Sequence, residues 1–391
     1  MKKKKPELLA PVGSFKCLAT AVSAGCDAVF FGLQEFNMRS RAQNFKLSDL
    51  PKIKEICGPV KKYLTLNTII YDEELKEVDR IIKKAKKDVD AIICSDIAVM
   101  MLCKKYKVPF HISTQCSVSN SETAKFYKKL GARRIVLARE LSLAQIKKIT
   151  KIIPVEVFVH GAMCVAVSGR CFTSQFLLGE SANRGKCVQP CRRYYIVKDD
   201  RGNELKVTNH HIFSAKDLCA LPYINELKKA GVSAFKIEGR NREPEYVDVV
   251  VRAYREAIDN DLGSVETAKL LEELKKVFNK GFSSGFLFGK PSANDFSNVE
   301  HNNATQTKRF IGKVTHYYSK IGVAEIKINA EDLALGEEIL VVGKRTPLIH
   351  KKIESMEINN EKIERAEKGQ EVGIKLPLCR TNDEVYKIIK N

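Results

Sequence analysis

The sequence lacks any uninterrupted apolar stretch of the ~18–20 residues that are needed to cross a bilayer, which argues against a membrane-spanning protein. Its basic start, MKKKK, reaches Pro11 before an apolar region develops, so a secretory signal is not predicted either. These two absences predict a cytoplasmic protein without a membrane partner. Trp is absent as well, and the H-E-x-x-H motif of zinc peptidases does not occur.

Cysteine and positive charge are abundant instead. Of 391 residues, 12 are cysteine, and Lys plus Arg (67) exceed Asp plus Glu (47) by 20. Because cytosolic thiols stay reduced, cysteines there indicate metal binding or catalysis more than disulfides. The charge surplus favours a polyanionic partner such as a nucleic acid, although a solvated Lys-rich surface explains it equally well. The length predicts two or three domains at ~100–200 residues each.

Eight short apolar runs are mostly followed by segments of helical periodicity. Continuous rather than alternating apolarity is typical of strands that are buried on both faces of a parallel sheet. Segments such as 121–130 and 142–152 have helical spacing, and a Ser can cap each of them. Eight such units predict an α/β fold, a closed (β/α)8 TIM-like barrel. The runs cover residues 6–10, 28–33, 63–67, 91–95, 110–114, 134–138, 155–160 and 234–238.

The active site of such a barrel lies at the C-terminal ends of its strands, and polar residues follow the runs there. Carboxylate and imidazole groups are candidates for acid–base chemistry, while amide and guanidinium groups are candidates for substrate contacts. Structural roles, such as helix capping or core packing, stay open for each of them. The candidate catalytic residues are His160, Glu140 and Glu238. The candidate substrate-binding residues are Arg39, Arg41, Asn67, Gln115, Arg139 and Arg240.

The regular spacing breaks once, between Gly161 and Ala234, and five of the 12 cysteines lie in this interval with the spacing C-x6-C-x15-C-x3-C-x27-C. A closed zinc site usually has two close cysteine pairs, and only Cys187 and Cys191 approach one. Widely spread thiols favour an iron–sulfur cluster, whose four ligands surround a cube. The cysteines elsewhere are expected to be small buried apolar residues.

The stretch 158–193, FVHGAMCVAVSGRCFTSQFLLGESANRGKCVQPCRR, resembles the signature of the collagenase-like peptidase family of unassigned catalytic type, peptidase family U32. The resemblance covers most of residues 6–290 and is closest to the tRNA-hydroxylating branch. Arg193 stands where the family usually has Trp, which puts a stacking contact in doubt. Further matching motifs are ELLAPVG at 7–13, STQCSVSN at 113–120, VLARELS at 136–142, SAKDLC at 214–219, KIEGR at 236–240 and NKGFSSGF at 279–286.

The resemblance implies iron–sulfur-dependent, oxygen-independent hydroxylation of RNA, with tRNA wobble uridine converted to 5-hydroxyuridine and prephenate as co-substrate. It implies a 4Fe-4S cluster held by Cys164, Cys171, Cys187 and Cys219, with Cys191 as an alternative to Cys187. The alternatives are hydroxylation of ribosomal RNA or of a quinone precursor, a peptidase, and an RNA-binding protein with a structural cluster. A peptidase requires a nucleophile with a base or an open metal site, and His160 has no obvious sequence partner.

Past the barrel, a predicted helix pair (244–260 and 265–280) precedes short alternating strands at 310–316, 322–328, 337–342 and 371–376. These strands predict a small closed β-barrel. It resembles the second-domain barrel of translation elongation factors and the C-terminal domain of the tRNA-hydroxylating branch, which the quinone branch lacks. The predicted domains are 1–290 with a cysteine-bearing insertion at 162–233, a linker at 291–307, and the β-barrel at 308–391.

Overall fold

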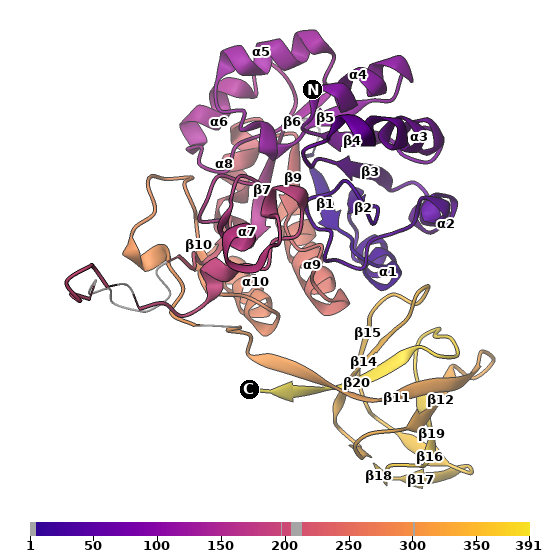
Figure 1. Cartoon of the computed structure of the whole chain (residues 1–391). Coiled ribbons are helices and arrows are strands. Elements are labelled where there is room, and N and C mark those ends of the chain that lie inside the picture. Colours follow the sequence, from indigo (N-terminus) through magenta and orange to yellow (C-terminus); the bar gives the residue numbers. More distant parts are fainter. Residues whose placement is uncertain (1–4, 197, 205–212, 300–301) are drawn as a thin grey trace.

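The computed structural model describes residues 5–196, 198–204, 213–299 and 302–391. Eight parallel strands close into a barrel, because each pairs with the next and β9 pairs with both β7 and β1 (Figure 1). The predicted TIM-like fold is confirmed. The strands are β1 (Glu7–Pro11), β2 (Ala28–Gly32), β3 (Lys61–Leu66), β4 (Ala91–Cys94), β5 (Phe110–Ile112), β6 (Arg134–Val136), β7 (Val155–Gly161) and β9 (Ala234–Ile237).

Helices surround the barrel. Ser142 caps α6 by accepting a bond from the Gln145 backbone, and the Gln145 side chain returns a bond to the Ser142 backbone. The cap of α5 is Asn120 and not Ser121, because the Asn120 side chain accepts from the Thr123 backbone. No helix in the described ranges is long and apolar enough to span a membrane. The helices are α1 (Phe15–Ser23), α2 (Leu50–Cys57), α3 (Leu75–Ala85), α4 (Ile97–Lys105), α5 (Ser121–Leu130), α6 (Leu143–Ile149), α8 (Ile224–Lys229), α9 (Pro244–Asp259) and α10 (Ser264–Lys276).

Side chains of the barrel strands alternate between the barrel interior and the surrounding helices. On β2, Phe30 belongs to the interior cluster and Phe31 to the core beneath the helices. On β9, Ala234 belongs to the interior cluster, and the same alternation turns Lys236 and Glu238 inward. The interior therefore becomes polar toward the C-terminal ends of the strands.

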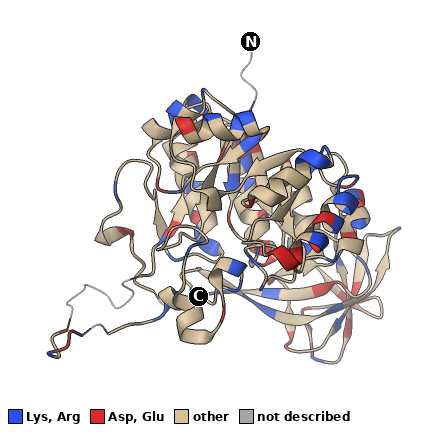
Figure 2. Cartoon of the chain, turned by 45° about the horizontal axis from the view of Figure 1, so that its top comes forward, with Lys and Arg blue, Asp and Glu red and all other residues tan. Residues whose placement is uncertain are grey.

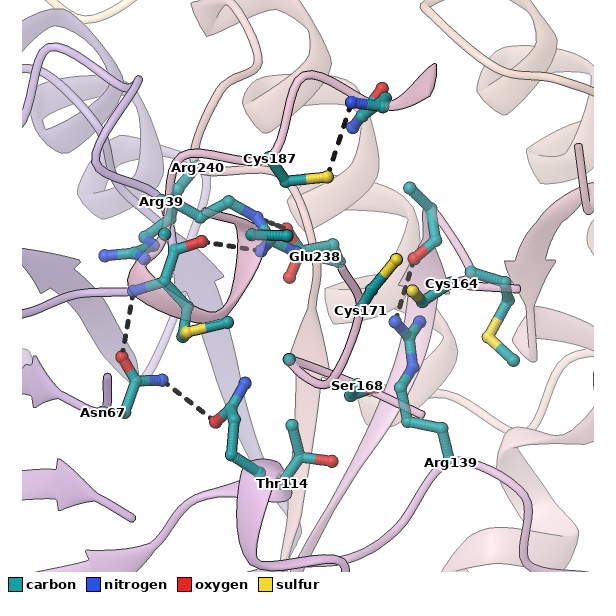
Figure 3. A pocket seen from close by; sticks show the side chains of 18 of the residues that line it. Arg39, Asn67, Thr114, Arg139, Cys164, Ser168, Cys171, Cys187, Glu238 and Arg240 are labelled. Atoms are coloured by element: carbon teal, nitrogen blue, oxygen red, sulfur yellow. Dashed lines mark hydrogen bonds and ion pairs between the residues drawn. The ribbon is translucent and has the colours of Figure 1, made fainter. Parts of the chain in front are cut away.

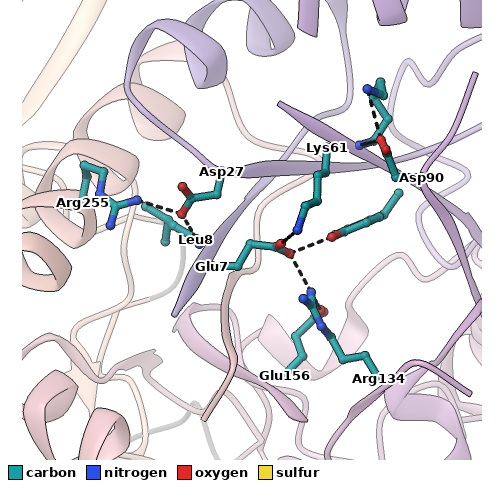
Figure 4. A network of polar contacts seen from close by, with 10 residues as sticks. Glu7, Leu8, Asp27, Lys61, Asp90, Arg134, Glu156 and Arg255 are labelled. Atoms are coloured by element: carbon teal, nitrogen blue, oxygen red, sulfur yellow. Dashed lines mark hydrogen bonds and ion pairs between the residues drawn. The ribbon is translucent and has the colours of Figure 1, made fainter. Parts of the chain in front are cut away.

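A ladder of ion pairs crosses the barrel interior (Figure 4). Glu7 accepts hydrogen bonds from Lys61 at 2.5 Å and from Arg134 at 2.7 Å. Arg134 also reaches Glu156 at 3.2 Å, and Glu156 accepts from Lys236 at 2.8 Å. Glu156 is 0% exposed and Lys236 is 4% exposed, so each depends on its partners for compensation of its charge.

The chain leaves the barrel after β7 and forms an insertion, of which residues 162–192 lie over the strand ends. It contains the short helix α7 (Thr173–Leu178) and ends in β8 (Asp217–Cys219), which runs antiparallel to β7 with Cys219 opposite His160. A two-residue strand, β10 (Phe282–Ser283), pairs with β8. The predicted interval 162–233 also includes α8, which is the ordinary barrel helix before β9.

The C-terminal residues form a separate antiparallel sheet. Its order is β15-β14-β20-β11-β12-β19-β16-β17, and no described pairing joins β15 to β17. The sheet is therefore a half-barrel and not the closed barrel predicted, and its edge strands have only four and three residues. The strands are β11 (Gln306–Tyr318), β12 (Val323–Ile328), β14 (Glu338–Val342), β15 (Ile349–Lys352), β16 (Met356–Ile358), β17 (Glu361–Ile363), β19 (Glu371–Lys375) and β20 (Glu384–Lys390), with β13 (Leu333–Ala334) and β18 (Arg365–Ala366) as a separate pair.

Candidate functional site

A cavity of about 150 Å³ lies between the C-terminal ends of the strands and the insertion (Figure 3). Its floor includes Phe30, Phe158 and Lys236, which point into the barrel. The Lys236 ammonium lies 4.1 Å from the centre of the Phe30 ring. Burial lowers the pKa of Lys236, while the partner carboxylate of Glu156 opposes that shift. The floor of the cavity therefore consists of the Lys236 ammonium, which is paired with Glu156 and lies over the ring of Phe30.

Three arginines surround one carboxylate in the wall of this cavity. Glu238 accepts from Arg39 Nε at 3.0 Å, and burial, which would raise the pKa of Glu238, is outweighed by the charges of Arg39, Arg139 and Arg240. Arg240 donates to Thr65 and Asn37, each at 3.0 Å. Burial and the nearby charge of Arg39 lower the pKa of Arg240 to about 9. Three cations with one carboxylate leave the wall with surplus positive charge for an anionic ligand.

Arg139 has donors without protein acceptors. Its Nη1 donates to the Ala162 carbonyl oxygen at 2.9 Å, and the guanidinium carbon lies 4.5 Å from the centre of the Phe158 ring. Its Nε and Nη2 are buried and make no hydrogen bond in the described structure. Since an unpaired buried cationic donor is costly, these two atoms mark a place where a ligand oxygen would bind.

Two amide side chains also line the cavity. Asn67 donates to Ser113 Oγ and to Gln115 Oε1, both at 3.2 Å, and accepts from the Met38 backbone at 3.2 Å. Asn67, Gln115, Arg39, Arg139, Arg240 and Glu238 all line the same cavity, so the structure brings these six predicted residues together.

Four free cysteines of the insertion line this cavity: Cys164, Cys171, Cys187 and Cys191. Burial raises the pKa of Cys191, the charge of Arg192 opposes this, and the three other thiols raise it further. The sulfur of Cys187 accepts from the Gln189 backbone at 3.4 Å and from Ser174 Oγ at 3.8 Å.

Cys219 is placed elsewhere. It is 4% exposed, does not line the cavity, and its sulfur lies 3.8 Å from the Tyr254 hydroxyl. Burial raises its pKa to about 11, which disfavours a thiolate at this position. The residue that joins Cys164, Cys171 and Cys187 at the cavity is Cys191, which the resemblance implied only as an alternative to Cys187.

His160 and Glu140 also lie outside the cavity. The His160 Nδ1 lies 3.3 Å from the Tyr254 hydroxyl, and its ring packs beside Tyr246 and Phe282. Burial lowers the pKa of His160 to about 3. His160 is therefore a packed core residue and not the predicted general acid or base. Glu140 is exposed in a turn, where it contacts solvent and does not line the cavity.

Arg41 is exposed and lines an adjoining cavity of about 290 Å³, together with Arg39 and Glu238. It therefore lies beside the site and not inside it. Lys236 and Arg192 also line the main cavity, although neither was among the predicted site residues. The motif KIEGR contains Lys236, and its position two residues before Glu238 was the available signal.

Gly185 fixes the distance between the insertion and the barrel. It has φ +87°, and a Cβ there would lie 2.1 Å from the Asn37 carbonyl oxygen. We expect Gly185→Ala to lift the insertion from the barrel, with faster proteolysis between Cys164 and Cys191 and a lower melting temperature. Gly179→Ala is the matched control, because Gly179 has φ +69° and open space around its Cβ position. The control should cost only about 1–2 kcal/mol. Equal effects of the two substitutions would contradict the predicted contact.

Comparison with known proteins agrees with the sequence motifs. Residues 13–297 match peptidase family U32. A protein named collagenase from Porphyromonas gingivalis is 41% identical, over 98% of this chain and 98% of its own. The tRNA hydroxylation protein P1 of Bacillus subtilis is 35% identical, over 80% of this chain and 78% of its own. The 23S rRNA 5-hydroxycytidine C2501 synthase of Escherichia coli is 33% identical, over 88% of this chain and 54% of its own. The chain belongs to peptidase family U32.

Proposed function

We propose that this protein is an RNA-modifying enzyme that hydroxylates a base without molecular oxygen, with tRNA wobble uridine as the substrate and 5-hydroxyuridine as the product. The observation that carries the proposal is that four free thiols and the unpaired donors of Arg139 share one cavity. Relatives named for tRNA hydroxylation and for 5-hydroxycytidine synthesis in 23S rRNA support the same class of reaction.

The thiols suit a 4Fe-4S cluster better than a single metal ion. Within the described ranges, no three His, Cys, Asp or Glu side chains converge closely enough for one ion. A cluster places one iron at each ligand and so accepts thiolates that are farther apart. In this proposal the ligands are Cys164, Cys171, Cys187 and Cys191, and Arg192 and Arg39 offset their negative charge. When bound, such a cluster supplies the redox chemistry that activates an oxygen donor.

The chain's own side chains would bind and orient the reactants. Prephenate, the co-substrate that the resemblance implies, carries two carboxylates, which suit the guanidinium groups of Arg139 and Arg240. Gln115 would present its amide group to the edge of a base that has left its stack, and Asn67 would hold Gln115 in place through the 3.2 Å hydrogen bond between them. Glu238 holds Arg39 in place through the 3.0 Å ion pair. The insertion covers the cavity and limits access of water.

Charge alone does not locate the RNA. Lys and Arg are distributed over the barrel helices and the C-terminal sheet, with Asp and Glu between them (Figure 2). The total surplus of 20 positive charges would attract RNA at long range, and recognition would depend on the cavity.

Two relatives from Porphyromonas gingivalis carry the name collagenase, which suggests peptide hydrolysis as the second candidate. No His lines the cavity among the described residues, so its thiols have no imidazole base beside them. The segment Gly281–Gly285, GFSSG, has the spacing of a serine-hydrolase motif. However, Ser283 Oγ donates to Asp295 at 2.6 Å, and Ser283 belongs to a two-residue strand and not to a strand-to-helix turn. The geometry therefore favours hydroxylation.

The test is to express the chain in a bacterial host that lacks its own RNA hydroxylases and to purify it without oxygen. We expect a brown protein with broad visible absorption, and hydroxylated uridine in tRNA by nucleoside mass spectrometry. Hydroxylated cytidine in ribosomal RNA, with unmodified tRNA, would instead identify ribosomal RNA as the substrate. A colourless protein, unmodified RNA and cleavage of denatured collagen would together overturn the proposal.

Arg139 provides a sharper test of anion binding. Because Nε and Nη2 have no protein partner, Arg139→Gln should raise the KM for prephenate by roughly 10- to 100-fold, the range for a lost hydrogen bond to a charged group. Arg139→Lys should recover part of this loss by retaining the charge. Arg133→Gln, at an exposed arginine beside the same strand, is the control. An unchanged KM in both Arg139 variants would rule out this role.

A further inference from the structure

The short helix α7 exposes aromatic side chains on the roof of the cavity. Phe172 is 57% exposed and Phe176 is 82% exposed, and their rings stack with centres 5.8 Å apart and planes 27° apart. A globular protein seldom leaves two neighbouring phenylalanines so open, and contiguous exposed apolar groups usually mark a binding surface. We call these two rings the aromatic platform.

The aromatic platform is continuous with the proposed active site. Thr173 and Ser174, which lie between the two rings in the sequence, line the main cavity. Phe172 lines a neighbouring groove of about 380 Å³. That groove and the main cavity share Met38, Asn67, Gln115 and Gly169. A chain molecule with one unit in the cavity would therefore place an adjacent unit against Phe172.

The segment of the insertion that carries the platform has a surplus of positive charge, which favours a polyanion. Residues 164–193 contain five Lys or Arg residues and one acidic residue, a surplus of four. Of the basic residues, Arg170, Lys186 and Arg193 are exposed. Arg170 donates to the Gln115 carbonyl oxygen at 3.3 Å, which places its guanidinium at the shared groove. Exposed rings beside cations are what an unpaired nucleotide requires, since the base stacks on the ring and its phosphate pairs with the cation.

We propose that Phe172 and Phe176 stack against an unpaired nucleotide that is adjacent to the modified one, so that the enzyme selects single-stranded loops over duplexes. This inference rests on the proposed function, because it assumes that the cavity accepts a base. Arg170 would contact the phosphate between the two nucleotides. The platform would therefore require the neighbouring nucleotide to be unpaired, whichever base it carries.

The test measures binding of the anaerobically purified holoenzyme to a fluorescein-labelled RNA hairpin and to a fully paired RNA duplex of equal length. The double variant Phe172→Ala/Phe176→Ala should bind the hairpin about 5- to 150-fold more weakly, as expected for loss of base stacking, with little change for the duplex. Phe172→Trp/Phe176→Trp should retain hairpin binding. Phe126→Ala is the matched control, because Phe126 is a 58% exposed phenylalanine on α5.

The outcomes separate this inference from the proposed function. Ring-dependent hairpin binding without any RNA hydroxylation would uphold the platform and overturn the proposed function. Normal hydroxylation with hairpin binding that ignores both rings would overturn the platform alone. If the double variant instead lost self-association in size-exclusion chromatography and kept hairpin affinity, the rings would belong to a protein interface and the inference would be wrong.

Discussion

Replacing Cys187 with serine is expected to remove the visible absorption of the anaerobically purified protein and to reduce RNA hydroxylation to the level of a strain without the gene. The reason is that Cys187 is a proposed ligand of the cluster, and a serine hydroxyl does not replace a thiolate as a ligand of its iron. Cys164→Ser and Cys171→Ser should behave alike. Cys191→Ser should do the same, whereas Cys219→Ser should keep the cluster, because the structure places Cys191 at the cavity and Cys219 beside Tyr254.

Cys116→Ser is the control for this series, since Cys116 is a half-buried free cysteine that does not line the cavity. Iron content and paramagnetic-resonance spectra would be compared at equal protein concentration, with circular dichroism as the check on folding. Loss of the cluster in Cys219→Ser and its retention in Cys191→Ser would restore the ligand set that the family resemblance implied.

Glu156→Gln is expected to lower the free energy of unfolding by about 3–5 kcal/mol, the usual cost of breaking a buried ion pair from one side. Glu156 is 0% exposed and accepts from both Lys236 and Arg134, so its neutralisation leaves the buried Lys236 ammonium without a counter-charge. Urea unfolding measures the change. Glu77→Gln is the control, because the exposed pair of Glu77 with Arg80 should contribute only about 0–1 kcal/mol.

A paired replacement distinguishes ion pairing from packing. Glu156→Leu combined with Lys236→Met removes both charges and keeps similar volume, so it should recover most of the stability lost in Glu156→Gln. If the double replacement restores the free energy of unfolding, the charges of the ladder depend on one another for their stability. A loss in Glu156→Gln no larger than in the Glu77 control would show that water already reaches the ladder.

The barrel could be predicted because each of its strands is buried on both faces. Such strands appear as continuous apolar runs, of which AVFFG in β2 and AIIC in β4 are examples. The C-terminal sheet was harder to predict. Its strand β17 has three residues and β13 has two, and pairing over such short lengths depends on contacts distant in the sequence.

The location of the site at the strand ends could be predicted. The direction in which each side chain points could not. His160 shows why. Strict alternation along β7 would turn His160 the same way as Phe158, into the barrel. The pairing of β7 with β9 shifts register between these two residues, and His160 instead meets the α9 residues Tyr246 and Tyr254. Nothing in the local sequence VEVFVHG marks this irregularity.

The floor of the cavity, which includes Lys236, contributes to the stability of the barrel, whereas the roof, formed by the insertion after β7, does not share the same ion pairs. Lys236 in the floor belongs to the ion-pair ladder, so any change in floor chemistry also affects how well the barrel folds. The roof contributes none of the ladder's side chains and is tied to the barrel through β8, at the end of β7. Laboratory evolution toward new substrates should therefore accumulate changes at the roof first, while the floor stays fixed until stabilising substitutions elsewhere make its replacement tolerable.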